Sequence, residues 1–392
     1  MKRFFLFAIL LTAILSLKAN DGVFFANGNH LVPITETDVR VQKEILTIKR
    51  VNDHLEVTVY YEFFNPTKEK KLLVGFEAES PYPTMEEDFS FLPEHSHIRN
   101  FTVMMNGQSL PYKIAHVPEL REDQTARDAY RDGQFKTIDK QAWLDSLEEH
   151  PYEVDFVYYF NAFFKKGLNI IQHTYEYDLS YGVGIEYEFL YVLTAANRWA
   201  NNGIDDFTLN IDMGERQSFQ MECSFFKNPN EWTIHGVGKC VQKGKRWTDN
   251  EVAMFHIQDG HISWQKKNFH PEGELNLFQY DFYMFSDIYM FSQPEKEWGV
   301  EDLFSNQYFK LDTNQIFTVQ NLPYQDETTG LSSDKRRILR NLPFAYRGYV
   351  FQNNKLRQYF ESCEWYIPNP SYEAKLEELS EPEQRWVEHW GK

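Results

Sequence analysis

The sequence contains 392 residues, 42% of them hydrophobic and 17% aromatic, which is enough apolar material for more than one packed core. Its formal net charge of −18 disfavours nucleic acid as a partner, because the two would repel each other. The chain also lacks the Gly-x-Ser-x-Gly nucleophile elbow and the His-Glu-x-x-His zinc motif. We therefore predict no cofactor and no metal site, and an enzyme is the less favoured interpretation.

Residues 1–19 have the pattern of a signal peptide. Lys2 and Arg3 precede an apolar run over residues 4–15, which is too short for an ordinary membrane-spanning helix. Cleavage would also remove Lys18, and the loss of three cations changes the net charge from −18 to −21. We expect an extracytoplasmic protein, in the periplasm or at the cell surface, with no transmembrane segment after cleavage.

Residues 20–115 alternate between apolar and polar positions, as β-strands with one buried face do. Asn106 and Gly107 are the signal for a type I′ hairpin turn. This pattern predicts a β-sandwich region. The alternating apolar positions are Leu55, Val57, Val59, Tyr61 and Phe63, then Leu72, Val74, Phe76 and Ala78, then Phe101, Val103 and Met105.

Residues 116–150 break the alternation and predict a helical insertion, with two short helices separated at Gly133. Before it, His95 and His97 could place two imidazoles on one side of a strand. A metal site needs three or four ligands, and nearby Pro93 indicates a loop, so we interpret both as surface histidines.

Residues 151–292 form a second predicted β region that is rich in aromatic residues. Rings on strands could stack on sugars, but in a sandwich they more often fill the core, which is our prediction. Cys223 and Cys240 are candidates for a disulfide between neighbouring strands, and Cys363 for a buried thiol. The aromatic runs are Phe156, Tyr158, Tyr159, Phe160, Phe163 and Phe164, and then the aromatic residues of 278–291.

Residues 293–325 are interpreted as a connector to a small helical module at residues 326–392. Asp334 is the predicted N-cap of the first helix, and the helix should end near Leu342 because the residue before Pro343 avoids α geometry. The fold class is therefore mainly β, with sandwich-like regions and a helical insertion, followed by a small α-helical C-terminal domain.

Three further signals place turns and helix starts in this module. Gly348 allows positive φ, and Asn353 or Asn354 can cap a second helix. Ser380 and Glu383 predict a capping box for the closing helix.

A basic run lies at the start of the module, with no acidic residue inside it. We consider two interpretations: a solvated helix face, or a docking patch for anionic groups of the cell envelope. Its members are Lys335, Arg336, Arg337, Arg340 and Arg347.

The module resembles the YARHG domain, a small module of secreted and surface-exposed bacterial proteins. Where that family has Tyr, Ala, Arg, His, Gly, this chain reads Phe344, Ala345, Tyr346, Arg347, Gly348. The resemblance implies an envelope-binding role. The other matching residues are Leu339, Arg340, Asn341, Tyr349, Val350, Phe351, Leu356, Tyr359, Phe360, Trp365, Tyr366 and Pro368.

Residues 20–285 are similar to an uncharacterised family of secreted bacterial proteins. The similarity lies in the segments NDGVFFANGNHLVPI, YEFFNP, YVLTAANRW and NFHPEGELNLFQYD. It implies secretion and leaves the activity open.

We predict a non-catalytic protein that binds or scaffolds at the cell envelope, with peptidoglycan as a candidate partner. The predicted binding residues, named at the end of this paragraph, could instead stabilise the fold of the small module. The alternatives are a glycan-active or wall-active hydrolase with an acidic pair, and an envelope assembly protein. The predicted binding residues are Arg340, Tyr346, Arg347, Trp365 and Tyr366.

Overall fold

The structure is a computed structural model, and it describes nine parts of the chain. The predicted signal peptide, most of the predicted helical insertion and the predicted connector lie outside the described residues. The described parts are residues 31–33, 37–78, 93–118, 139–141, 154–182, 185–243, 250–280, 333–363 and 366–391.

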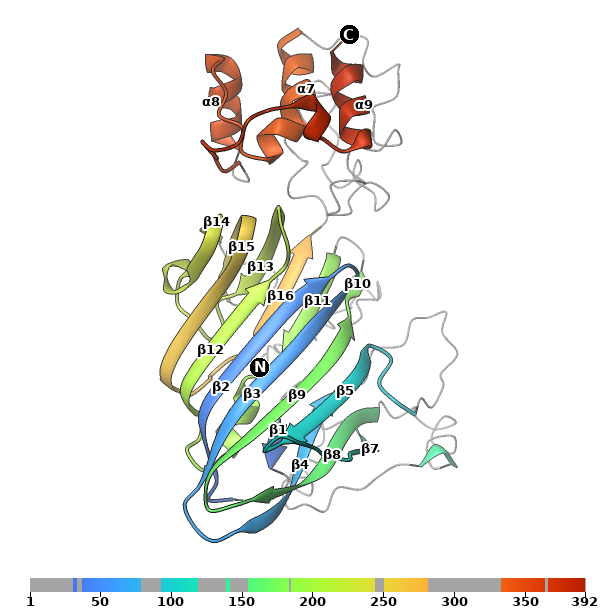
Figure 1. Cartoon of the computed structure of the whole chain (residues 1–392), viewed down its shortest axis with the longest axis vertical. Coiled ribbons are helices and arrows are strands. Elements are labelled where there is room, and N and C mark those ends of the chain that lie inside the picture. Colours follow the sequence, from blue (N-terminus) through green and yellow to red (C-terminus); the bar gives the residue numbers. More distant parts are fainter. Residues whose placement is uncertain are drawn as a thin grey trace, which may run out of the picture.

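The main element is a 12-stranded sheet with the order β10-β11-β16-β13-β15-β12-β2-β3-β9-β5-β6, in which β14 also pairs with β15 (Figure 1). Among the described residues, three short 3-10 helices accompany the strands and the module, at Thr194–Arg198, Pro229–Glu231 and Leu376–Glu378. The strands of this sheet are β2 (Arg40–Val51), β3 (His54–Asn65), β5 (Ile98–Met105), β6 (Gln108–Ser109), β9 (Gly167–Asp178), β10 (Ser180–Gly182), β11 (Ile185–Tyr191), β12 (Ile204–Asp212), β13 (Gln217–Glu222), β14 (Thr233–Lys243), β15 (Val252–Phe269) and β16 (Leu275–Tyr280).

A second sheet has four strands in the order β1-β4-β8-β7. One core contains buried residues from both sheets, which confirms the mainly β prediction. All the alternating positions predicted in residues 20–115 are buried, because period-two side chains share one face of a strand. The four strands are β1 (Leu31–Pro33), β4 (Lys70–Ala78), β7 (Lys113–Pro118) and β8 (Val154–Phe164).

The ranges 20–115 and 151–292 do not form separate sheets. Strand β2 pairs in parallel with β12, where Val41 lies opposite Ile204, and β4 pairs with β8. Both predicted β regions therefore contribute to the same two sheets, which sequence periodicity alone did not reveal.

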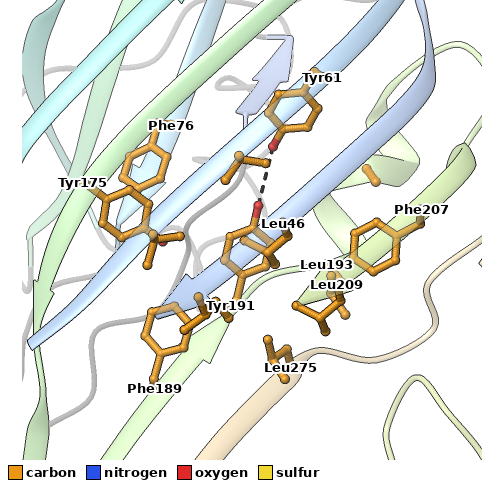
Figure 2. Close-up of a cluster of buried hydrophobic side chains, with 14 of the residues drawn as sticks. Leu46, Tyr61, Phe76, Tyr175, Phe189, Tyr191, Leu193, Phe207, Leu209 and Leu275 are labelled. Carbon is orange, nitrogen blue, oxygen red and sulfur yellow. Dashed lines mark hydrogen bonds between the residues drawn. The ribbon is translucent and has the colours of Figure 1, made fainter. Parts of the chain in front are cut away.

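Aromatic residues of the first predicted run fill this core, Phe278 of the second is also buried, and Figure 2 shows part of the core. Residues 281–291 of the second run lie outside the described residues. The hydroxyl groups of Tyr61 and Tyr191 lie 3.5 Å apart, and Tyr191 donates a hydrogen bond to Glu44 Oε1 at 3.4 Å. This contact gives the buried Glu44 carboxylate a polar partner inside an apolar cluster. Phe163 is the exception in its run, because its side chain is exposed.

Two local predictions in the β region have opposite outcomes. Asn106 and Gly107 have φ values of 51° and 80°, which confirms the hairpin turn between β5 and β6. The interpretation of His95 as a surface residue is wrong, because its ring is 2% exposed. The Tyr158 hydroxyl accepts the His95 backbone N–H at 3.2 Å, and burial lowers the His95 pKa to about 3.

The C-terminal module has three helices, α7 (Ser333–Tyr346), α8 (Asn354–Ser362) and α9 (Glu381–Trp390). They enclose a second, separate core that includes Leu339, Phe360 and Trp386. Asn353 caps α8, since its side chain accepts the backbone N–H groups of the residues two and three positions later. Asp334 is not an N-cap: it lies in the first turn of α7 and pairs with Lys355 at 2.7 Å.

Helix α7 continues through Pro343, so the prediction that it ends near Leu342 is wrong. Proline has no N–H to donate to the carbonyl of Leu339, four residues earlier. The indole Nε1–H of Trp386 on α9 donates to that carbonyl instead, at 2.7 Å in a buried setting. A contact from a distant helix therefore compensates for the missing helical hydrogen bond.

Trp386→Phe is expected to destabilise the module by about 1–3 kcal/mol, because it leaves the Leu339 carbonyl buried without a donor. In a Pro343→Ala background the N–H of the new alanine can donate to the Leu339 carbonyl. Trp386→Phe should then lower the free energy of unfolding by much less. A double-mutant cycle in urea measures this coupling. Equal costs in both backgrounds would show that Trp386 acts only through packing.

Candidate functional site at the junction of sheet and module

The described residues form a pocket where the C-terminal module meets β13 and β15. Its volume is about 280 Å³ when the space open to solvent is included. The sheet supplies one wall and the module supplies the other. The lining includes Arg216, Ser218, His256, Gln258, Tyr346 and Ile367.

A serine and a histidine meet at the sheet wall of this pocket. Ser218 on β13 lies opposite His256 on β15, so both side chains project from the same face, and Ser218 Oγ lies 2.7 Å from His256 Nδ1. Such a pair is one part of a nucleophilic site. Both side chains are nevertheless almost fully buried, at 3% and 2% exposure. We therefore interpret the pair as part of the packing between sheet and module.

Three contacts fix the module on the sheet. The Tyr346 hydroxyl donates to the Arg216 carbonyl at 2.9 Å, and Lys239 Nζ donates to the Tyr366 carbonyl at 3.2 Å. Gly348 has φ of 79°, and a Cβ there would lie 2.4 Å from the Ile367 carbonyl oxygen and 2.7 Å from Gln258 Nε2 on β15. Glycine is thus required by the turn and by the close approach of the Ile367 backbone, and it also brings the Gln258 side chain against the module.

Arg347 and Tyr366, two of the predicted binding residues, make internal contacts. Arg347 forms a bidentate salt bridge with Glu383 on α9, with N–O distances of 2.7 and 2.9 Å, and also donates to the Pro343 carbonyl. The Tyr366 hydroxyl donates to the Tyr349 carbonyl at 2.8 Å. Burial raises the Tyr346 pKa above its ordinary value, so that hydroxyl remains a donor at neutral pH.

The remaining predicted residues differ in their setting. Arg340 is exposed on α7, next to the exposed Arg336 and Arg337, and its guanidinium lies near Gly391 at the C-terminal end of α9. Trp365 lies outside the described residues. Arg336, Arg337 and Arg340 occur at helix positions i, i+1 and i+4, so they form one stripe, which we call the arginine stripe.

Glu188 on β11 is a second polar feature of the sheet face that bears Ser218. Its pKa is raised to about 7, mainly by burial; the hydrogen bond with Asn276 opposes this rise, and the negative charge of nearby Glu222 contributes to it. A carboxylic acid near neutral pKa beside a second carboxylate is the pattern of an acid–base pair. The sequence offered no signal for this pair, since the residues lie on different strands.

The strand order does not bear out the prediction that Cys223 and Cys240 lie on neighbouring strands. Cys240 is on β14, Cys223 directly follows β13, and β15 lies between these strands. Strands two places apart are separated by roughly 10 Å, beyond the Cα distance of a disulfide. Both are free thiols, and burial raises their pKa values to about 12 for Cys240 and about 11 for Cys223. Cys363 is buried, as predicted.

Within the described parts of the chain, no group of three or more His, Cys, Asp and Glu side chains could hold a metal ion. No helix among the same residues is long and apolar enough to cross a membrane.

Comparison with known proteins identifies one region. Residues 315–392 match the model of the YARHG domain, so the chain contains a YARHG domain. No curated protein matches the chain.

The chain is similar to a number of solved structures, two of which illustrate the range. One is a candidate nutrient binding protein from Legionella pneumophila, at 16% identity over 94% of this chain and 99% of that chain, with a TM-score of 0.45. The other is baculovirus P35, at 8% identity over 64% of this chain and 99% of that chain, with a TM-score of 0.24. At these TM-scores neither structure informs the function.

Proposed function

We propose that this protein acts outside the cytoplasm by binding an anionic component of the cell envelope, with peptidoglycan as the first candidate, through the arginine stripe of its YARHG domain. The YARHG match favours an extracytoplasmic binding module. The β-sheets act as the body on which the module is held, through the hydrogen bonds of Tyr346 and Lys239.

The observation that carries this proposal is the contrast between two groups of cations in one module. Arg347 is withdrawn from solvent by its salt bridge to Glu383. Arg336, Arg337 and Arg340 are exposed, and none of them forms a salt bridge within the described residues. Planar guanidinium groups bind carboxylates and phosphates in bidentate geometry.

The net negative charge of the whole chain makes a local cationic site necessary for binding an anion. A formal charge of −18 repels anionic polymers, so attraction requires a local concentration of positive charge. The arginine stripe supplies it on one helix face. Because exposed charges are screened over a Debye length of about 8 Å at physiological salt, such binding should weaken as salt rises.

Replacing Arg336, Arg337 and Arg340 together with alanine is expected to lower retention on purified sacculi roughly tenfold at low salt. The matched control replaces Arg357, Lys375 and Arg385 with alanine. These are three exposed cations of the same module, and they contact Asn354, Glu378 and Glu381. Both variants change the net charge equally, so only a site-specific interaction separates them.

The assay uses the chain from residue 20 onward and measures the bound fraction at rising salt. Retention that is equal for the two variants, or that does not depend on salt, would remove the proposal.

A further inference from the structure

Exposed apolar side chains gather at one end of the β-sheets. The hairpin turns β3–β4 and β8–β9 meet there, and we call the exposed residues of 68–71 and 163–170, together with Met104, the hairpin tip. Among the described residues five large hydrophobic side chains are exposed, and four of them lie in the tip. These four are Met104 at 42%, Phe163 at 52%, Leu168 at 54% and Ile170 at 36%.

The strand register makes three of these side chains, Leu168, Ile170 and Met104, neighbours on the 12-stranded sheet. Leu168 and Ile170 lie two residues apart on β9 and so project from the same face. Met104 on β5 lies opposite Gln172, the next position on that face of β9. Phe163 lies on the other sheet, near the end of β8, where it pairs with Lys71 on β4; it shares the end of the molecule with Leu168 because the β8–β9 turn joins the two strands.

The same turns present lysines. Lys68, Lys71, Lys165 and Lys166 are exposed, and the Lys71 ammonium lies 5.6 Å from the centre of the Phe163 ring. Glu69 is the exposed acid in these segments, while Lys70 is already paired with Asp38. On a chain with a net charge of −18, the tip is therefore locally cationic.

Buried asparagines hold the turns in place. Asn65 is fully buried, and its side-chain amide donates to the carbonyls of Lys68 and Phe164, which ties the two hairpins together. Asn169, also fully buried, accepts from the Lys165 N–H and donates to the Lys165 carbonyl. The apolar and cationic side chains are thus presented by a pre-formed surface, so little ordering is required on binding.

We propose that the hairpin tip docks on an anionic lipid bilayer, with Phe163 and Leu168 entering the interface and the four lysines contacting lipid phosphates. Apolar side chains flanked by lysines are the combination that binds an anionic membrane surface. A soluble anionic polymer would use the lysines alone and would leave the apolar side chains in water. An apolar protein partner would not explain the surrounding lysines.

This inference adds a second contact to the proposed function and depends on it only for the compartment. Figure 1 shows the β3–β4 and β8–β9 turns at the lower end of the molecule and helices α7, α8 and α9 at the upper end. A molecule bound to lipid by the tip would therefore point its arginine stripe away from the membrane, toward a second envelope layer.

The test is flotation of the chain from residue 20 onward with vesicles of phosphatidylcholine alone or with about a quarter phosphatidylglycerol. We expect binding only to the anionic vesicles. Lys165→Glu with Lys166→Glu should weaken it at least roughly twentyfold, since each lysine near an anionic surface contributes about fivefold. Phe163→Ser with Leu168→Ser should weaken it at least roughly tenfold.

Matched controls are available elsewhere on the chain. Lys266→Glu with Lys267→Glu reverses another exposed lysine pair on β15, and Leu376→Ser removes the exposed apolar side chain outside the tip. Both should stay within about twofold of the wild type. The Arg336, Arg337, Arg340 triple variant should also float normally, while the tip variants should keep their retention on sacculi, so the two proposals fail independently.

Absence of wild-type flotation at low salt would overturn the inference. Vesicle binding at the wild-type level by both tip variants would also overturn it. Loss of binding in the lysine variant alone, with the serine variant unaffected, would indicate adhesion by charge without insertion and would also overturn it. A wild-type dimer in light scattering that Leu168→Ser dissociates, without vesicle binding, would assign the tip to a second copy of the chain.

Discussion

Glu383→Gln is expected to destabilise the YARHG domain by about 3–5 kcal/mol. The Glu383 side chain has no exposure, and it receives two hydrogen bonds from Arg347 and one from the Ser380 backbone N–H at 2.8 Å. Glutamine keeps the shape but leaves the Arg347 guanidinium, itself largely buried, without a counter-charge. Removing one partner of a buried ion pair lowers the free energy of unfolding by about this amount.

The control for this substitution is Glu381→Gln, on the same helix and also in its first turn. Glu381 is exposed and pairs with Arg385, so its loss should cost less than about 1 kcal/mol. Hydrogen exchange of α7 and α9 amides reports the opening of the module separately from the sheets. Replacing Arg347 with methionine in the Glu383→Gln chain should recover much of the loss. A small and equal cost for both glutamines would contradict this account.

Glu188→Gln is expected to stabilise the protein by about 2–3 kcal/mol at about pH 8 and by less than about 1 kcal/mol at about pH 5. Its folded pKa is raised to about 7 from the ordinary 4.5, mainly by burial. A raised carboxyl pKa means that the group favours folding while it is protonated below its unfolded pKa. That contribution is lost as the pH rises through 7, and glutamine removes the dependence.

Urea unfolding of wild type and variant at the two pH values measures this effect. Glu56→Gln is the control, because Glu56 is exposed on β3 and should change stability by less than about 0.5 kcal/mol at either pH. Glu188→Gln also tests the rival hydrolase function. Turnover of a glycan by the wild type that disappears in Glu188→Gln, despite the higher stability, would replace binding with catalysis.

Local patterns were sufficient where a short segment determines its own structure. The alternation from Leu55 to Phe63 identified β3, and the Asn106–Gly107 pair identified the turn between β5 and β6, because both signals depend on neighbouring residues. The Asn353 cap was found for the same reason. These elements could be predicted without knowledge of the rest of the chain.

Long-range pairing accounts for what could not be predicted. The rule that helices end before proline failed at Pro343, because the compensating donor Trp386 lies on another helix. The salt bridge between Arg347 and Glu383 could not be predicted either, because the sequence indicated Glu383 only as a capping residue. The Ser218–His256 contact arises from the register between β13 and β15, which no local motif encodes.

The parallel pairing of β2 with β12 also affects the order in which the chain can fold. Strand β2 lies between β3 and β12, and one of its hydrogen-bonding edges stays open until residues near Ile204 have emerged. A contact order this high slows folding and exposes an unpaired strand edge to other chains. Export of an unfolded chain is compatible with such delayed closure, and the interval before β12 arrives is the stage most vulnerable to aggregation.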